Sequence, residues 1–84
     1  MKAKIIVMPK KTVLDPQGKT VKNALELMSF KGIKDVRVGK FIEVELTGRD
    51  PAGLKRKMDK ACHDLLSNPV IEEYRLELTT NEHE

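Results

Sequence analysis

Hydrophobic and polar residues alternate between Val36 and Leu46. The even positions are apolar except for Lys40, and most odd positions are polar or charged. A period of two places each set on its own face of an extended strand. A three-residue loop over Gly39–Phe41 would also keep the apolar faces matched, as a hairpin. Two alternatives therefore stay open: one long strand bent or bulged near Gly39, or two strands joined there.

The length of this stretch favours one long strand. Residues 34–47, fully extended, would span roughly 45 Å at about 3.3 Å per residue. A compact domain of 84 residues has a radius of gyration near 12 Å, so a diameter of about 30 Å. Such a strand would overhang its own monomer. We therefore expect the sheet to be shared between two copies of the chain.

A first strand is predicted over residues 3–8, where Ile5 and Val7 share one face and Ile6 and Met8 the other. Apolar residues on both faces are typical of a strand that is covered on both sides. Pro9 is expected to end it, because proline cannot donate to the ladder.

A first helix is predicted over residues 16–31. Asp15 is an N-cap residue, and Pro16 has no amide to lose at the first helical position. Gly32 is the expected C-terminal cap. Four apolar residues at helical spacing form one stripe: Val21, Ala24, Leu25 and Met28.

The same opening recurs 35 residues later, where Asp50 and Pro51 begin a second helix. Both an internal duplication and convergent capping can explain the repeat. Asn68 precedes Pro69 and ends this helix, because the residue before proline is disfavoured in helical conformation. A last strand follows over residues 70–78, with alternate residues facing inward. The inward positions of the helix and strand are Leu54, Met58, Ala61, Cys62, Leu65, Leu66, Tyr74, Leu76 and Leu78.

This order predicts an α+β chain with two layers, β-α-β-α-β, and a long central strand bent near Gly39. The β-α-β-β-α-β ferredoxin-like order is the alternative if Gly39 separates two strands. The chain is short and forms one domain, which buries only about 60–65% of its unfolded surface. A sheet shared across a homodimer would extend the core.

Composition excludes several classes of protein. The 16 basic and 13 acidic residues give a net charge of +3, which is a mixed surface and not the basic excess of a nucleic-acid-binding domain. The single cysteine, Cys62, excludes an internal disulfide and fits a reducing compartment. No apolar run approaches 18 residues. We therefore expect a cytoplasmic protein without membrane contact.

Candidate chemistry is sparse. Cys62 and His63 are neighbours on a helix, about 100° apart, so they cannot form a nucleophile–base pair. Cys62 lies on the apolar stripe and is expected in the core. The basic cluster at residues 55–60 is interrupted by Asp59 and faces solvent. We expect no catalytic, metal-binding or cofactor-binding residue. A small-molecule-binding regulatory domain of β-α-β type remains the alternative function.

Three blocks of sequence resemble the PurS family, the small subunit of phosphoribosylformylglycinamidine synthase in purine biosynthesis. They are Val-Leu-Asp-Pro-Gln-Gly-Lys at residues 13–19, Val-Arg-Val-Gly-Lys-Phe-Ile-Glu at residues 36–43, and Cys-His-Asp-Leu-Leu-Ser-Asn-Pro-Val-Ile-Glu-Glu-Tyr at residues 62–74. The resemblance covers essentially the whole chain and implies a single PurS-like domain over residues 1–84.

The resemblance implies a non-catalytic subunit of an ATP-dependent, glutamine-hydrolysing ligase. A large synthetase subunit (PurL-like) binds ATP, magnesium and formylglycinamide ribonucleotide, and a glutaminase subunit (PurQ-like) releases ammonia from glutamine. The small subunit, as a homodimer or higher even oligomer, bridges the two and supports ammonia transfer. Asp15 and Asn68 also have capping explanations. The exposed residues of the matching blocks are the candidate subunit contacts: Asp15, Gln17, Arg37, Lys40 and Asn68.

Overall fold

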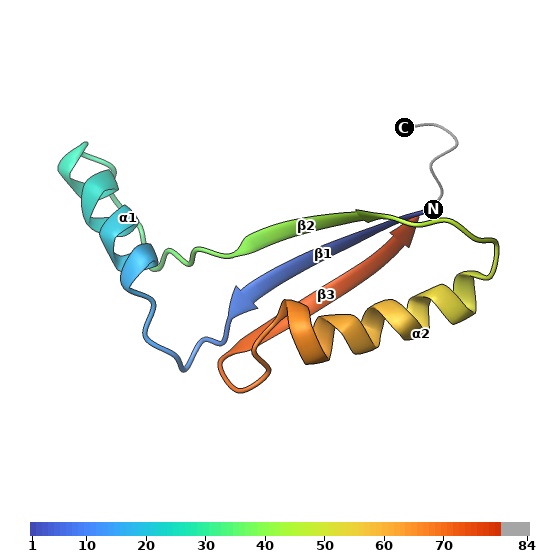
Figure 1. Cartoon of the computed structure of the whole chain (residues 1–84). Helices are drawn as coiled ribbons and strands as arrows, with labels where there is room; N and C mark the ends of the chain where they lie inside the picture. Colours follow the sequence, from blue (N-terminus) through green and yellow to red (C-terminus); the bar gives the residue numbers. More distant parts are fainter. Residues whose placement is uncertain (80–84) are drawn as a thin grey trace.

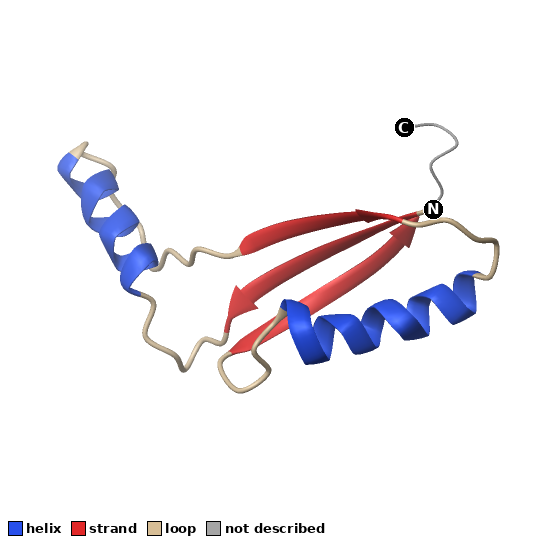
Figure 2. Cartoon of the chain, viewed as in Figure 1, coloured by secondary structure: helices blue, strands red, loops and turns tan. Residues whose placement is uncertain are grey.

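The computed structural model describes residues 1–79 and confirms the α+β class and the predicted order of elements (Figures 1 and 2). Each helix begins at a proline that follows a capping aspartate. The elements are β1 (Lys2–Pro9), α1 (Pro16–Leu27), β2 (Lys40–Glu45), α2 (Pro51–Ala61), the π-helical turn η1 (Cys62–Leu66) and β3 (Glu72–Thr79).

The three strands form an antiparallel sheet in the order β2-β1-β3. β1 is the central strand, so both of its edges are paired. Ile5 lies opposite Ile42 on one side and Leu76 on the other. Apart from Ile6, Met8 and Phe41, this register places the apolar residues of all three strands on one face of the sheet, as the alternation within each strand requires.

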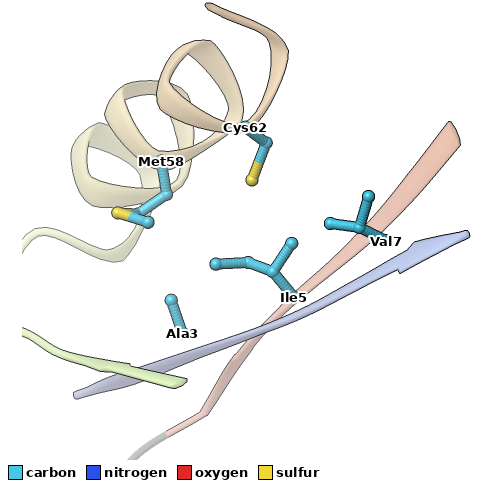
Figure 3. Packing of buried hydrophobic residues seen from close by; sticks show 5 residues of the cluster. All are labelled: Ala3, Ile5, Val7, Met58 and Cys62. Atoms are coloured by element: carbon cyan, nitrogen blue, oxygen red, sulfur yellow. The ribbon is translucent and has the colours of Figure 1, made fainter. Parts of the chain in front are cut away.

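The core lies between that face and α2, which runs along the sheet (Figure 1). Figure 3 shows Ala3, Ile5 and Val7 of β1 pointing toward Met58 and Cys62 of the helical segment. All five residues are buried, which confirms Cys62 as a core residue. The prediction that β1 is covered on both sides is wrong within one chain. Ile6 belongs to the opposite face, which neither α1 nor α2 covers, and is 36% exposed.

β2 is shorter than predicted, because it begins only at Lys40. Residues 36–39 lie outside the sheet. The amide of Val38 donates to the Asp15 carboxylate and therefore makes no ladder bond. The backbone of Gly39 lies so close to the Val7 carbonyl and the Met8 side chain that a Cβ there would collide with both. Among the described residues there is no hairpin at Gly39, so the β-α-β-β-α-β order is not adopted.

The end of α1 also differs from the prediction, because the helix stops at Leu27 rather than near residue 31. Ser29 adopts a left-handed conformation with φ of 69°. The amide of Ser29 donates to the Glu26 carbonyl, and that of Phe30 to the Leu25 carbonyl. These two bonds form a Schellman motif, in which serine takes the position usually held by glycine.

The chain is extended rather than compact. Its radius of gyration is 16.4 Å, against about 12 Å for a compact chain of this length. α1 projects from one end of the sheet and does not cover it (Figure 2). Gly18 is the only buried residue of this helix. None of the helices within residues 1–79 is long and apolar enough to cross a membrane.

Candidate functional site at one end of the sheet

Asp15 joins the start of α1 to the segment before β2. Its Oδ1 accepts the amide hydrogen bond of Gly18 at 3.0 Å, which confirms the predicted N-cap. Its Oδ2 accepts the amide of Val38 at 2.9 Å. Hydrogen bonds from Gly18 and then Val38 lower the pKa of the Asp15 carboxyl group, because both favour the charged form. Asp15 is therefore a helix cap and a tertiary link at once.

Arg37 holds the same segment against the ends of β1 and β3. Its Nη2 donates to the carbonyl of Pro9 and lies 3.5 Å from a carboxylate oxygen of Glu73. The Arg37 side chain is 22% exposed. Its Nε is buried and has no acceptor among the described residues. These contacts fix the position at which the chain enters β2.

Asn68 organises the loop between η1 and β3. Its Oδ1 accepts the amide of Val70 at 3.1 Å, and its backbone amide donates to the Glu72 carboxylate at 2.7 Å. The Asn68 carbonyl accepts the amides of Ile71 and Glu72. The loop is tied to the residue after β1, because the Lys10 amide donates to the Ile71 carbonyl at 2.9 Å.

Two candidate contacts, Gln17 and Lys40, have exposed side chains that form no hydrogen bond or ion pair with other residues in the range 1–79. Gln17 lies in the first turn of α1, and Lys40 opens β2 opposite Val7. The structure thus brings candidates from three separate parts of the sequence to one end of the sheet. We call this region the sheet-end junction: Asp15, Gln17, Arg37, Lys40 and Asn68.

The other chemically notable residues lie outside the sheet-end junction. Burial raises the pKa of the Cys62 thiol. His63 points to the surface, with Nδ1 3.0 Å from Oδ1 of Asp64. No group of three or more His, Cys, Asp or Glu residues that could hold a metal ion occurs within residues 1–79.

Sequence reasoning missed several residues of this region. Glu73, the partner of Arg37, and the close approach of Gly39 to β1 depend on contacts across the sheet. Lys19 and Lys22 also lie near the junction, on the α1 side. Their i, i+3 spacing on one helix face was the available signal.

Together the fold and the sheet-end junction define a small α+β scaffold, in which polar side chains fasten separate segments to one another. Residues 2–80 match the family model PurS, described as phosphoribosylformylglycinamidine (FGAM) synthase. The chain belongs to the PurS family, a subunit of FGAM synthase in purine biosynthesis.

Relatives match over nearly their whole length. The PurS subunit of Bacillus subtilis is 44% identical over 79 residues, which cover 92% of this chain and 90% of that protein. The PurS subunit of Methanocaldococcus jannaschii is 35% identical over 77 residues, covering 92% and 93%. These matches include all the blocks on which the resemblance was noted.

Solved structures agree with the fold. The crystal structure of Methanocaldococcus jannaschii PurS superposes with a TM-score of 0.82 at 33% identity, covering 96% of this chain and 98% of that one. A chain in the structure of PurLQS from Thermotoga maritima gives a TM-score of 0.81 at 34% identity, covering 90% and 93%. The second match places a similar chain inside a complex.

Proposed function

We propose that this chain acts as a homodimer that bridges the large synthetase subunit (PurL-like) and the glutaminase subunit (PurQ-like) of FGAM synthase, without an active site of its own. ATP and magnesium belong to the synthetase subunit in this proposal. Support comes from the family and from the similarity to a chain of PurLQS. A cytoplasmic location fits the unpaired, buried Cys62.

The observation that carries the proposal is the amount of apolar surface that one chain leaves uncovered. Within residues 1–79, five apolar side chains are buried, whereas ten large ones are exposed. The apolar side chains that one chain buries are fewer than the large ones that it exposes, and exposed apolar residues that gather in a patch mark interaction sites. The exposed set is Ile6, Leu14, Val21, Leu27, Met28, Phe30, Phe41, Leu65, Val70 and Ile71.

A second copy is the occupant that we propose for the apolar side of α1. This helix has 12 residues, and isolated helices of about 12–15 residues are marginal in water. It lacks packing against its own sheet, and Val21 and Met28 on its stripe are 39% and 69% exposed. Stable folding before assembly with other subunits therefore calls for a permanent partner, which another copy supplies.

The dimer can be tested by sedimentation equilibrium. We expect a mass of about twice 9.5 kDa. Met28→Glu places a charge on the apolar stripe and should shift the mass toward the monomer. Asn23→Glu is the matched control, because Asn23 lies on the opposite side of α1 from Val21, where the same substitution should leave the mass unchanged. A monomeric wild-type chain would overturn the dimer.

The sheet-end junction is the surface that we propose for the unlike subunits. Gln17 and Lys40 offer exposed polar groups there, and the loop built by Asn68 presents Val70, which is 78% exposed. The junction is held by hydrogen bonds and an ion pair within the chain, so it offers a fixed shape. A rigid, closely fitting contact keeps water away from ammonia as it passes between active sites.

Lys40→Glu tests this surface in the reconstituted enzyme. Reversal of an interface charge should weaken assembly by about 1 kcal/mol, which raises the concentration of chain needed for half-maximal glutamine-dependent activity about fivefold. Activity with added ammonia should not change. Lys57→Glu, on the exposed side of α2, is the control for net charge. Equal effects of both variants, or equal loss with ammonia, would contradict the proposed surface.

A further inference from the structure

A cavity of about 330 Å³ lies between the connection from β1 to α1 and the connection from α1 to β2. Its apolar wall includes Pro9, Val13 and Val36. The volume is within the range of about 300–1,000 Å³ that is usual for small-molecule sites. The cavity is therefore large enough for a ligand bigger than a bare ion.

The charge around this cavity is strongly one-sided. Five cationic residues line it, with only two acidic ones, Asp15 and Asp35. The excess of three positive charges equals the net charge of the entire chain, so the rest of the chain is balanced. A concave surface lined by one sign of charge concentrates the field and attracts the opposite ion. The cationic residues are Lys10, Lys11, Lys19, Lys22 and Arg37.

Several of these cations lack an anionic partner in the part of the chain that the structure describes. Lys22 donates from Nζ to the Lys34 carbonyl at 3.2 Å, which leaves its charge uncompensated. Among the described residues, Lys10, Lys11 and Lys19 form no ion pair. Bringing such charges together is unfavourable unless a counter-ion joins them.

Asp15 does not act as the counter-ion for these lysines. The Asp15 carboxylate is already occupied by the amides of Gly18 and Val38. In the first turn of α1 the amide of Gly18 thus bonds to the Asp15 carboxylate, and the amide of Lys19 bonds to the Asp15 carbonyl. An anion in the cavity would therefore be held by lysine ammonium groups, as a point-charge site, rather than by the helix terminus.

We propose that this cavity binds the phosphate group of a small phosphorylated molecule or of free phosphate. A phosphate monoester carries close to two negative charges at neutral pH and matches the local excess better than a single carboxylate does. No aromatic residue lines the cavity, so no stacking surface for a base is present. Recognition rests on the phosphate, with the apolar wall against the remainder of the ligand.

Calorimetry on the full chain, without other subunits, tests this site at physiological ionic strength. The probes are inorganic phosphate and ribose 5-phosphate, with acetate as the carboxylate control. Binding of inorganic phosphate alone identifies free phosphate as the ligand, and tighter binding of ribose 5-phosphate identifies an ester. The proposal is overturned if acetate binds as tightly as either phosphate compound. It is also overturned if neither phosphate compound gives a heat of binding at a concentration 10-fold above about 1 mM.

Paired variants locate the site. Replacing both Lys10 and Lys19 by Gln should weaken phosphate binding at least about tenfold. The matched control replaces Lys57 and Lys60 on α2 by Gln, with the same change in net charge, and should leave binding unchanged. Equal weakening by both pairs would show non-specific attraction and overturn the site. In the wild-type chain, phosphate should shift the amide resonances of Gly18 and Lys19, so the result does not depend on variant folding.

Discussion

Gly18 and Gly53 occupy the same third position of α1 and α2, but their surroundings differ. A Cβ on Gly18 would collide with the carbonyl oxygen of Val36 and lie 2.9 Å from its carbonyl carbon. A Cβ on Gly53 would meet only the side chain of Asp50, the cap of its own helix. Substitution by alanine therefore tests whether α1 is seated against the Val36 backbone.

The expected magnitudes follow from these contacts. Glycine to alanine in a helix gains about 1 kcal/mol from propensity. At Gly53 the Asp50 side chain must rotate away, and loss of an N-cap costs about 1 kcal/mol, so the two effects nearly cancel. At Gly18 a Cβ would also lie 2.7 Å from Oδ2 of the Asp15 cap, so the same two effects nearly cancel there. The backbone of Val36 must move in addition, and such overpacking costs about 1–3 kcal/mol. Gly18→Ala should therefore be less stable than Gly53→Ala by about 1–3 kcal/mol.

Urea unfolding followed by far-ultraviolet circular dichroism measures this difference. All proteins must be compared at one concentration, because the stability of an oligomer depends on it. In thermal unfolding, each kcal/mol should lower Tm by about 4–8 °C. If Gly18→Ala is as stable as Gly53→Ala, or more stable than wild type, helix propensity alone governs the site. The contact between α1 and Val36 would then be absent in solution.

Three further predictions concern titratable groups. The hydrogen bond to Asp59 raises the pKa of Tyr74 to about 12, so the absorbance of its phenolate should appear near pH 12. Asp59→Asn should lower the midpoint of this titration. The stability linked to the bond is complete below about pH 10 and is lost as the pH rises toward 12. Backbone hydrogen bonds lower the pKa of Asp15, so its contribution to the free energy of unfolding is complete above about pH 4 and is lost as the pH falls. In Asp15→Asn the free energy of unfolding should therefore decrease less steeply with falling pH. Cys62 is fully buried and its thiol has a raised pKa, so a thiol reagent should label it only at the rate at which the protein unfolds. Labelling of the folded protein at the rate of a free thiol would contradict the burial of Cys62.

Local signals predicted the parts of the fold that depend on neighbouring residues. Asp15 and Asp50 each cap a helix that begins one residue later, and the chemistry of each cap lies within four residues. The alternation in β3 likewise predicted which side chains face the core. These features needed no knowledge of distant contacts.

Most errors arose where distant residues decide the outcome, whereas the end of α1 depends on a local conformation. The start of β2 was misplaced because the Val38 amide bonds to Asp15, 23 residues earlier. The end of α1 was misplaced because Ser29 adopts a conformation usually taken by glycine. The basic cavity could not be seen in the sequence, since its lysines come together only when Asp15 fastens two connections to each other.

The candidate contacts lie in the blocks that resemble the PurS family, and their grouping at one end of the sheet depends on the fold. Arg37 and Asp15 serve the chain's own structure, which the sequence could not reveal for Arg37. Gln17 and Lys40 stay predictions as interface residues. Substitution of these two residues separates binding to other subunits from folding more cleanly than substitution of Arg37.

The central claim is that this chain works by joining other subunits. It is tested most directly by measuring FGAM formation with purified synthetase and glutaminase subunits, with and without the chain. Glutamine-dependent formation of FGAM should require the chain and should rise until the chain is stoichiometric with the other subunits. Ammonia-dependent formation should not require the chain, because the chain supplies no catalytic residue. Full glutamine-dependent activity in its absence, or turnover of substrate by the chain alone, would contradict the account.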